Sequence, residues 1–250
     1  FFSARGVQQY LPEYDIPVWY GRELWKTDGT PDGTVMVKDI NPGYDDYGSF
    51  PQDLTVAGDS RVFFTAHTDD IGRELYFSDG TTDGTHLVKD LLPGVNDVGP
   101  SNLTFVNGIL LFALDDGQQG TELWCSDGTE AGTQVLMDIW PGPGSSDPQY
   151  LCSTHGVVYF SAVHPESGRE LWKSDGTVGG TVLVKDIVPG TGSSLPQAMM
   201  PYGSEGLVFF AADDGVSGRE LWKSDGTAEG TILAKDIFPG AGSSDPTYLM

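Results

Sequence analysis

The sequence has 250 residues, of which 38% are hydrophobic and 11% aromatic, so the chain is long enough to bury a core. Thirteen basic residues stand against 36 acidic ones, which gives a formal net charge of −23. This charge excludes nucleic-acid binding, because such proteins present a Lys/Arg surface to phosphates. No apolar run approaches the roughly 18 residues of a membrane-spanning helix, so we expect no membrane span.

A ten-residue motif recurs five times along the chain. GRELWKSDGT occurs at 168–177 and again at 218–227, and related stretches occur three times earlier. The spacing of about 50 residues between motifs indicates one structural unit repeated five times. We therefore predict a single domain over residues 1–250, with motif starts at Gly21, Gly72, Gly120, Gly168 and Gly218.

Within each unit, short apolar runs alternate with clusters of Gly, Asp, Ser and Pro, a pattern typical of strands and turns. In the second unit we expect strands around 54–56, 62–66, 74–77 and 86–91. The stretch SDGTxxGT between the third and fourth strands supplies the positive-φ positions of a tight hairpin. Four antiparallel strands in each of five units predict an all-β, five-bladed β-propeller, with the first strand of each blade innermost.

The two ends of the sequence predict how this ring closes. The chain begins with FFSA, which matches a second strand, and ends with SSDPTYLM, a run that elsewhere leads into a first strand. We therefore expect the C-terminal run to form the inner strand of the blade that begins at Phe1. An open solenoid would carry atypical capping repeats instead.

The acidic residues of the motif predict cross-strand ion pairs rather than catalysis. A hairpin centred after Thr30 places Glu23 opposite Lys38 and Arg22 opposite Asp39, and three further units repeat these pairs. The motif also repeats an aromatic residue, which we expect to pack between neighbouring units. These aromatic residues are Trp25, Tyr76, Trp124, Trp172 and Trp222.

These motifs resemble the ELWxxDGT-repeat family. ELW, DGT, GT and a KDI-x-PG tail recur over essentially the whole chain, and ELYFSDGT and ELWCSDGT are the departures. The family is largely secreted, so the resemblance implies an extracellular location or an organelle lumen, and it assigns no activity. The architecture is also similar to tachylectin-type five-bladed sugar-binding propellers, by analogy of fold and repeat length only.

The two cysteines lie in neighbouring units. Cys125 takes a position that Lys holds in three sister motifs, and Cys152 opens the following unit. A disulfide between the units and a pair of thiols are both compatible with the sequence.

A pair of acidic residues recurs in the loops between the second and third strands. In the predicted propeller these loops share one face with the links between blades. Oxygen ligands of this kind suit Ca²⁺. Asp-Asp-Gly is equally a common turn sequence with solvated carboxylates, so both interpretations stay open. The candidate Ca²⁺ ligands are Asp69, Asp70, Asp115, Asp116, Asp213 and Asp214.

One of these loops is longer than its counterparts. Residues 5–20, RGVQQYLPEYDIPVWY, stand where the second unit has five residues. Aromatic residues on this face suit stacking on sugar rings or anchoring of a protein partner, or the loop fills the central opening. The candidate binding residues are Tyr10, Tyr14, Trp19 and Tyr20.

No catalytic residues stand out in the sequence. A glycosidase needs two carboxylates around the central channel, and Asp53 is almost the only acid near the starts of the inner strands. The four His residues share no repeat position. We therefore predict an extracellular binding module that is not an enzyme, with lectin-like multivalent carbohydrate recognition. The alternative is a structural or protein–protein assembly module that docks through loop 5–20; a glycosidase is less favoured.

Overall fold

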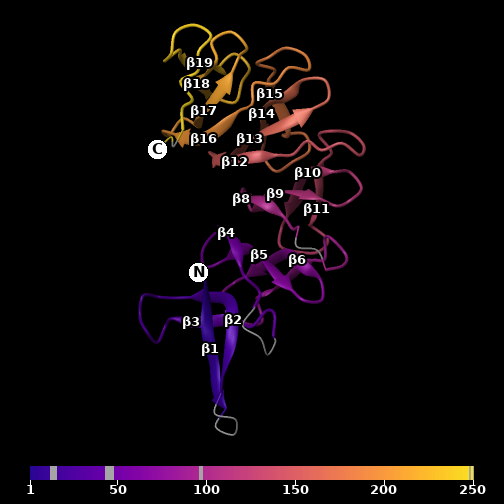
Figure 1. Ribbon diagram of the computed structural model, residues 1–250, viewed down its shortest axis with the longest axis vertical. Coiled ribbons are helices and arrows are strands. Elements are labelled where there is room, and N and C mark those ends of the chain that lie inside the picture. The colour runs from indigo at the N-terminus through magenta and orange to yellow at the C-terminus, as the bar shows by residue number, and fades with distance from the viewer. Residues whose placement is uncertain (12–15, 43–47, 96–97, 248, 250) are drawn as a thin grey trace. The chain divides into compact units, whose positions relative to one another are not determined.

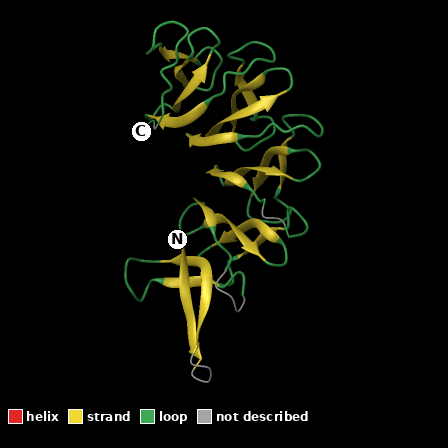
Figure 2. Ribbon diagram, in the orientation of Figure 1, coloured by secondary structure: helices red, strands yellow, loops and turns green. Residues whose placement is uncertain are grey.

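The computed structural model describes residues 1–11, 16–42, 48–95, 98–247 and 249, with the backbone alone for residues 7–11 and 16–20. Throughout this described part, regular secondary structure consists of β-strands without helices (Figure 2). The strands form five antiparallel sheets (Figure 1). The predicted all-β class is therefore confirmed. No helix of the described residues is long and apolar enough to cross a membrane.

The strands of each sheet follow one another in chain order, so that hairpins join all neighbours. The first sheet contains β1 (Phe2–Leu11), β2 (Ile16–Lys26) and β3 (Val35–Lys38). The second sheet contains β4 (Gln52–Val56), β5 (Val62–Thr68), β6 (Gly72–Ser78) and β7 (His86–Lys89). The third contains β8 (Ser101–Val106), β9 (Ile109–Asp115), β10 (Thr121–Ser126) and β11 (Gln134–Met137). The fourth contains β12 (Gln149–Thr154), β13 (Val157–His164), β14 (Gly168–Ser174) and β15 (Val182–Lys185), and the fifth β16 (Gln197–Tyr202), β17 (Leu207–Asp213), β18 (Arg219–Ser224) and β19 (Ile232–Lys235).

The first sheet differs from the others because it has three strands. The C-terminal run that we expected to complete it follows β19 and is not assigned as a strand in its described residues. Tyr248 and Met250 of this run lie outside the described residues. Ring closure by the C-terminal strand therefore stays a prediction.

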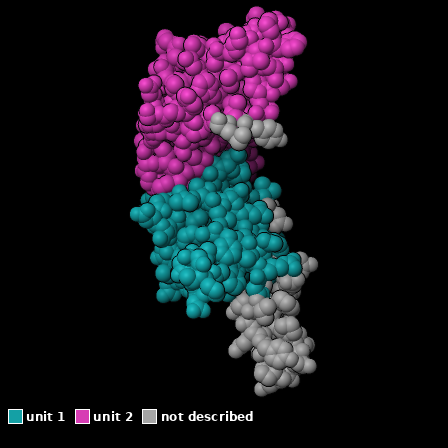
Figure 3. Space-filling view, turned by 90° about the vertical axis from the view of Figure 1, so that its left-hand side faces the viewer, with its two compact units in different colours: residues 1–103, 127–133 teal, residues 104–126, 134–250 magenta. Residues whose placement is uncertain are grey.

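The chain forms two compact units. Residues 1–103 and 127–133 make the first, and residues 104–126 and 134–250 make the second (Figure 3). The first unit contains the first two sheets and the hairpin loop between β10 and β11. The second unit contains the fourth and fifth sheets and most of the third, so the pocket described below is formed by residues of this unit alone.

In three repeats the aromatic residue of the motif packs against the preceding sheet, as predicted. The side chains of Tyr76, Trp172 and Trp222 are at most 6% exposed, and each belongs to a hydrophobic cluster with residues of the neighbouring sheet. The clusters contain Tyr76 with Leu24 and Val37, Trp172 with Leu111 and Leu123, and Trp222 with Leu171 and Val184. Burial of one such side chain stabilises the fold by roughly 1.5–3 kcal/mol.

The hairpin between the third and fourth strands is held by its own side chains. In the fourth sheet, the Thr177 N–H and Oγ1–H donate to Asp175 Oδ1 over 2.9 and 2.7 Å, and the Gly180 N–H donates to Thr177 Oγ1 over 3.0 Å. A Cβ on Gly180 would lie 2.0 Å from Asp175 Oδ1, so only glycine fits. Hydrogen bonds from Thr177 lower the pKa of Asp175. The predicted hairpin is therefore confirmed.

The predicted cross-strand ion pairs are wrong. A β-bulge between Leu24 and Trp25 shifts the register, so that Lys38 lies opposite Leu24 instead of Glu23. A shift of one residue changes every pairing beyond it. Lys38 Nζ instead donates to the carbonyl oxygen of Thr85 in the hairpin of the second sheet, over 2.6 Å.

The same lysine contact recurs inside both units. Lys89 Nζ donates to Thr133 O over 2.8 Å, and Lys185 Nζ donates to Thr231 O over 2.7 Å. In each case a lysine at the end of a fourth strand holds the hairpin that follows the motif in the next repeat. The lysines of the KD tail therefore join successive sheets.

Candidate functional site

The glutamate of the motif is buried in every repeat and holds the link that leads to the next sheet. Glu122 and Glu170 are both fully buried. Glu122 accepts hydrogen bonds from the Ile139 N–H at 2.8 Å, and from the N–H and hydroxyl of Ser146 at 2.9 and 2.6 Å. Burial raises the pKa of Glu122, and the hydrogen bonds from Ser146 and Ile139 oppose that rise. This carboxylate is therefore a structural clasp rather than a candidate acid or base.

Glu170 makes the same clasp in the fourth sheet. It accepts from the Ile187 N–H at 3.1 Å, the Ser194 N–H at 2.9 Å and the Ser194 hydroxyl. Ser146 and Ser194 lie in the links, three residues before the first residues of β12 and β16. The two buried glutamates therefore fix the position of each link just before its inner strand begins. The links in turn carry the residues that line a pocket.

Each link contains residues in the left-handed backbone region. Asp147 and Tyr150 have φ values of 46° and 56°, and Leu195 and Ala198 have φ values of 50° and 52°. Asp tolerates this conformation, whereas for Leu, Tyr and Ala it costs roughly 1–2 kcal/mol. Tyr150 and Leu195 are also 46% and 45% exposed. Strained, exposed residues of this kind concentrate at functional sites.

A pocket of about 210 Å³ lies between the starts of the fourth and fifth sheets, inside the second unit. Two arginines approach it from β14 and β18, and their side chains are each 15% exposed. The links supply amide, phenol and apolar groups. The lining residues are Gln149, Tyr150, Arg169, Leu195, Pro196, Gln197 and Arg219. The lining contains two arginines and no carboxylate, although the chain as a whole is strongly acidic.

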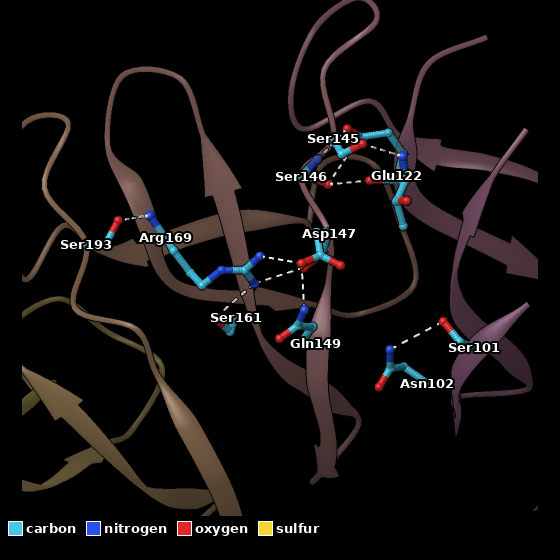
Figure 4. A network of polar contacts seen from close by, with 11 residues as sticks. Ser101, Asn102, Glu122, Ser145, Ser146, Asp147, Gln149, Ser161, Arg169 and Ser193 are labelled. Carbon is cyan, nitrogen blue, oxygen red and sulfur yellow. Dashed lines mark hydrogen bonds and ion pairs between the residues drawn. The ribbon is translucent and has the colours of Figure 1, made fainter. Parts of the chain in front are cut away.

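Arg169 is occupied by a carboxylate of the link. Its Nη1 donates to Asp147 O over 2.9 Å, and its Nη2 donates to Asp147 Oδ2 over 2.6 Å (Figure 4). Gln149 Nε2 donates to the same carboxylate oxygen over 2.5 Å. Ser161 Oγ lies 3.5 Å from Nη1. The positive charge of Arg169 is therefore largely neutralised by the Asp147 carboxylate.

Arg219 has the same place in the fifth sheet but a different partner. Its Nη1 donates to Leu195 O over 2.8 Å, as Arg169 does to Asp147 O. Leu195 has no side-chain acceptor, and the nearest carboxylate oxygen, Asp245 Oδ1, lies 3.8 Å from Nε on a side chain that is 69% exposed. Among the contacts of the described residues, none involves Arg219 Nη2. Arg219 therefore keeps a donor edge for a ligand.

The predicted Ca²⁺ ligands make turn contacts in the structure. The Asp115 carboxylate accepts from the Gly117 N–H, and Asp116 accepts from the N–H groups of Gln118 and Gln119. The same pattern occurs at Asp213 and Asp214, while Asp69 contacts Asn41. Within the described ranges, no group of three or more His, Cys, Asp and Glu is placed to hold a metal ion. Ca²⁺ binding stays a prediction.

The long loop of the first unit is an extended hairpin. The backbone of β1 and β2 pairs from Phe2 with Trp25 out to Leu11 with Ile16. The side chains of Tyr10, Trp19 and Tyr20 lie outside the described part, as does the whole of Tyr14. Partner binding by these residues stays a prediction.

The remaining residues singled out from the sequence have structural surroundings. Asp53 Oδ2 lies 3.4 Å from the hydroxyl of Thr65. Cys125 and Cys152 are both thiols, and burial raises the pKa of Cys152 to about 11. Of the described histidines, His155 contacts the Thr154 hydroxyl and His164 accepts from the Glu166 N–H.

The pocket residues were missed by the sequence analysis, which treated the arginines as halves of ion pairs. One signal was present. The last three links read SSDPQ, SSLPQ and SSDPT, so that Leu195 stands where its counterparts in the other two are Asp, while the first link has Phe50 at this position.

Comparisons with known proteins identify relatives by fold alone. No protein-family model matches the sequence, and no curated protein matches it. Solved structures do match. A structure from a study of two prolyl endopeptidases, concerned with inter-domain dynamics in catalysis and specificity, has a TM-score of 0.54 and 13% identity, over 85% of this chain and 30% of that chain.

Two structures of puromycin hydrolase are similar to the same extent. The enzyme complexed with PGG has a TM-score of 0.51 and 16% identity, and a second structure has a TM-score of 0.51 and 14% identity. Each match covers 86% of this chain and 32% of the hydrolase. The chain thus spans less than a third of the length of these enzymes, and at this identity the similarity shows the fold.

These relatives overturn the predicted function. The sequence analysis favoured a lectin-like carbohydrate-binding module, or an assembly module docking through loop 5–20, and in either case no enzyme. The solved structures that share the fold are of prolyl endopeptidases and puromycin hydrolase, which contradicts both the predicted function and the prediction that the protein is not an enzyme. The prediction of a multivalent binder assumed that near-identical sheets form near-identical pockets. The pocket of the second unit instead depends on a difference between repeats.

Proposed function

We propose that the five sheets are the blades of a β-propeller and that this propeller is the peptide-binding part of a peptidase-like protein. The similarity in fold to prolyl endopeptidases and puromycin hydrolase supports this proposal, because the match covers 85–86% of the present chain and 30–32% of those enzymes. In the proposed arrangement the propeller holds peptide, and bond cleavage takes place elsewhere in the protein. The resemblance to the largely secreted ELWxxDGT-repeat family supports peptide binding outside the cell or in an organelle lumen.

The single observation that carries the proposal is the pocket of the second unit. It combines two guanidinium groups with the side-chain amides of Gln149 and Gln197, the phenol of Tyr150 and an exposed Leu195. Amide and guanidinium groups match the carbonyl oxygens and carboxylates of a peptide, and the apolar groups match its side chains. The volume of about 210 Å³ is smaller than the roughly 300–1,000 Å³ of drug-sized ligand sites, so it suits one residue of a peptide.

The buried glutamates favour this pocket over a site within the motif itself. Their carboxylates are engaged by N–H groups and serines of the links, and are inaccessible to a substrate. The polar groups left for a ligand in the fourth and fifth sheets therefore lie at the starts of the inner strands. The site therefore combines the arginines of the motif with residues of the links and inner strands that differ between repeats.

Isothermal titration with short peptides and with oligosaccharides tests this function. We expect peptides to bind with a dissociation constant of about 1 mM or tighter, and oligosaccharides to give no heat under the same conditions. Mass spectrometry of the titrated peptides separates binding from hydrolysis. A folded chain, checked by circular dichroism, that binds no peptide of any sequence contradicts the proposal.

A further inference from the structure

In the fifth sheet a leucine stands in place of the aspartate that pairs closely with the arginine of the fourth, and the carboxylate that remains near Arg219, that of Asp245, lies 3.8 Å from Nε. In the fourth sheet, Arg169 contacts both the carbonyl and the carboxylate of Asp147. In the fifth, Arg219 makes the equivalent carbonyl contact to Leu195, and the carboxylate is replaced by an isobutyl group. The carbonyl contact is retained, and the close carboxylate contact that Arg169 Nη2 makes has no equivalent at Arg219 among the described residues.

The surroundings of Arg219 keep it directed into the pocket. Its side chain is 15% exposed, and the carbonyl contact at 2.8 Å fixes Nη1. The backbone N–H of Arg219 donates to Ser243 Oγ over 2.9 Å, which fixes the start of β18. Held in this way, the guanidinium presents Nη2 without a large loss of side-chain entropy on binding, which favours affinity.

The charge of the pocket is exceptional in this molecule. The chain carries 36 acidic and 13 basic residues, yet two arginines and no carboxylate line this cavity. A guanidinium binds carboxylates with two parallel hydrogen bonds, and a partly buried site strengthens them. Since Arg169 is paired with Asp147, Arg219 is the lining cation that an anionic ligand would contact.

We propose that Arg219 binds a carboxylate of a peptide, in the pocket that Leu195 leaves open. This inference rests on the proposed peptide-binding function and names the ligand group that the site selects. Gln149 and Gln197 provide donors and acceptors for the neighbouring peptide groups, and Tyr150 and Pro196 provide apolar contact. The carboxylate comes either from the C-terminus of a peptide or from an Asp or Glu side chain.

Three peptides of equal length distinguish these two sources. The first is acetylated, has a free C-terminus and contains no acidic residue. The second is acetylated and amidated and contains one glutamate, and the third replaces that glutamate by glutamine. We expect the peptide with the accepted carboxylate to bind roughly 10- to 100-fold more tightly than the third, since hydrogen bonds to charged groups are worth more than neutral ones.

Two variants remove the proposed interaction in different ways. Arg219→Gln removes the cation. Leu195→Asp instead supplies the carboxylate that Asp147 supplies to Arg169, so that Arg219 is occupied from within the protein. Both variants are expected to reduce carboxylate-dependent binding to the level of the neutral peptide. Because Leu195→Asp introduces a residue that sister repeats tolerate, loss of binding there is not explained by misfolding, which thermal unfolding verifies.

Arg73→Gln is the matched control. Arg73 holds the same motif position in the second sheet and donates to Phe50 O over 3.1 Å, but it belongs to the other unit and does not line the pocket. This variant carries the structural cost of losing the arginine–carbonyl contact without touching the proposed site. We expect it to bind all three peptides as the unchanged protein does.

The outcomes separate the inference from the proposed function. Carboxylate-dependent binding that disappears in Arg219→Gln and Leu195→Asp and persists in Arg73→Gln supports the site. Equal binding of all three peptides, unaffected by Arg219→Gln, overturns the carboxylate site and leaves peptide binding intact. Absence of binding by every peptide overturns both.

Discussion

The fourth and fifth sheets share an identical ten-residue motif, yet they present different chemistry where their links reach the pocket. Arg169 forms an ion pair with the carboxylate of Asp147, whereas Arg219 donates to the backbone carbonyl of Leu195. The shared residues build the sheet, and the one residue that differs decides whether an arginine is structural or available. Function in a molecule of this kind is therefore found by comparing repeats position by position, because the repeat itself explains only construction.

The largest effect is expected from removing the buried glutamate that holds the link in both sheets. Glu170→Ala leaves the Ile187 N–H and both donors of Ser194 without their acceptor in a buried site. We expect a loss of about 3–5 kcal/mol in the free energy of unfolding, measured by chemical denaturation. Glu166→Ala, on an exposed turn residue two positions from the motif, is the control and should change stability by less than about 0.5 kcal/mol.

A natural defect in the clasp of the second sheet extends the comparison. Val98 stands where the other sheets have serine, and among the described residues Glu74 accepts from the N–H groups of Leu91 and Leu92. Burial raises the pKa of Glu74 from 4.5 to about 7, and these two hydrogen bonds oppose the rise. The folded protein thus holds a proton that the unfolded chain releases near pH 4.5.

The sign of the resulting pH dependence follows from this raised pKa. The stabilisation from protonated Glu74 is complete below about pH 4.5 and is lost as the pH rises through about 7, a change of at most about 3 kcal/mol. Val98→Ser places a serine at this position, as in the sister sheets, and we expect it to flatten this decline and to raise stability at pH 8. Denaturation curves at several pH values measure the effect. An unchanged decline in Val98→Ser would show that the serine is not what lowers the pKa in the sister sheets.

Asp147→Leu makes the fourth sheet resemble the fifth. It removes a charged contact to Arg169 and places Leu at a φ of 46°, and we expect a loss of about 1–2 kcal/mol in unfolding free energy. Asp147→Asn retains a residue that tolerates this conformation and removes only the charge, so it should cost less than about 1 kcal/mol. Equal losses in the two variants would mean that the backbone conformation contributes nothing to the difference.

Leu195→Asp makes the opposite change and has the smallest expected effect. It relieves Leu of a φ of 50° and supplies Arg219 with a carboxylate, so we expect a gain of about 0.5–1 kcal/mol at pH 7. The gain should disappear below about pH 4, where an aspartate takes up its proton. A destabilised Leu195→Asp protein at pH 7 would show that the two sites differ by more than this residue.

Much of the fold could be predicted from the sequence because turn chemistry and repetition are local signals. The Asp175-Gly176-Thr177 hairpin and the packing of Trp172 follow from residue type and position alone. The pairing of Glu23 with Lys38 failed because a bulge inserts one residue into the register, and no residue in the motif marks it. A buried glutamate satisfied by a link about 24 residues away leaves no local pattern to detect.

The site could not be predicted because the sequence marks residues that recur or that form an insertion, whereas the pocket depends on a difference between two repeats. Arg219 recurs, but its significance depends on Leu195, which is ordinary by composition and unusual only beside Asp147 and Asp245. The contact between them joins positions 24 residues apart through an arginine and a backbone carbonyl. Side-chain hydrogen bonds to carbonyl groups carry no sequence signature, so only the structure shows which link each arginine reaches.

The lysine contacts between successive sheets have a consequence for how such a molecule is assembled over evolutionary time. Lys185 donates to the hairpin carbonyl of Thr231, and Lys38 and Lys89 donate to the equivalent carbonyls of Thr85 and Thr133. The first, second and fourth repeats therefore each encode a lysine donor for their successor, whereas the third has Met137 in its place. The second repeat carries both the lysine donor and the threonine carbonyl acceptor, so a tandem duplication of such a repeat in the gene would supply a complete contact on both sides at once.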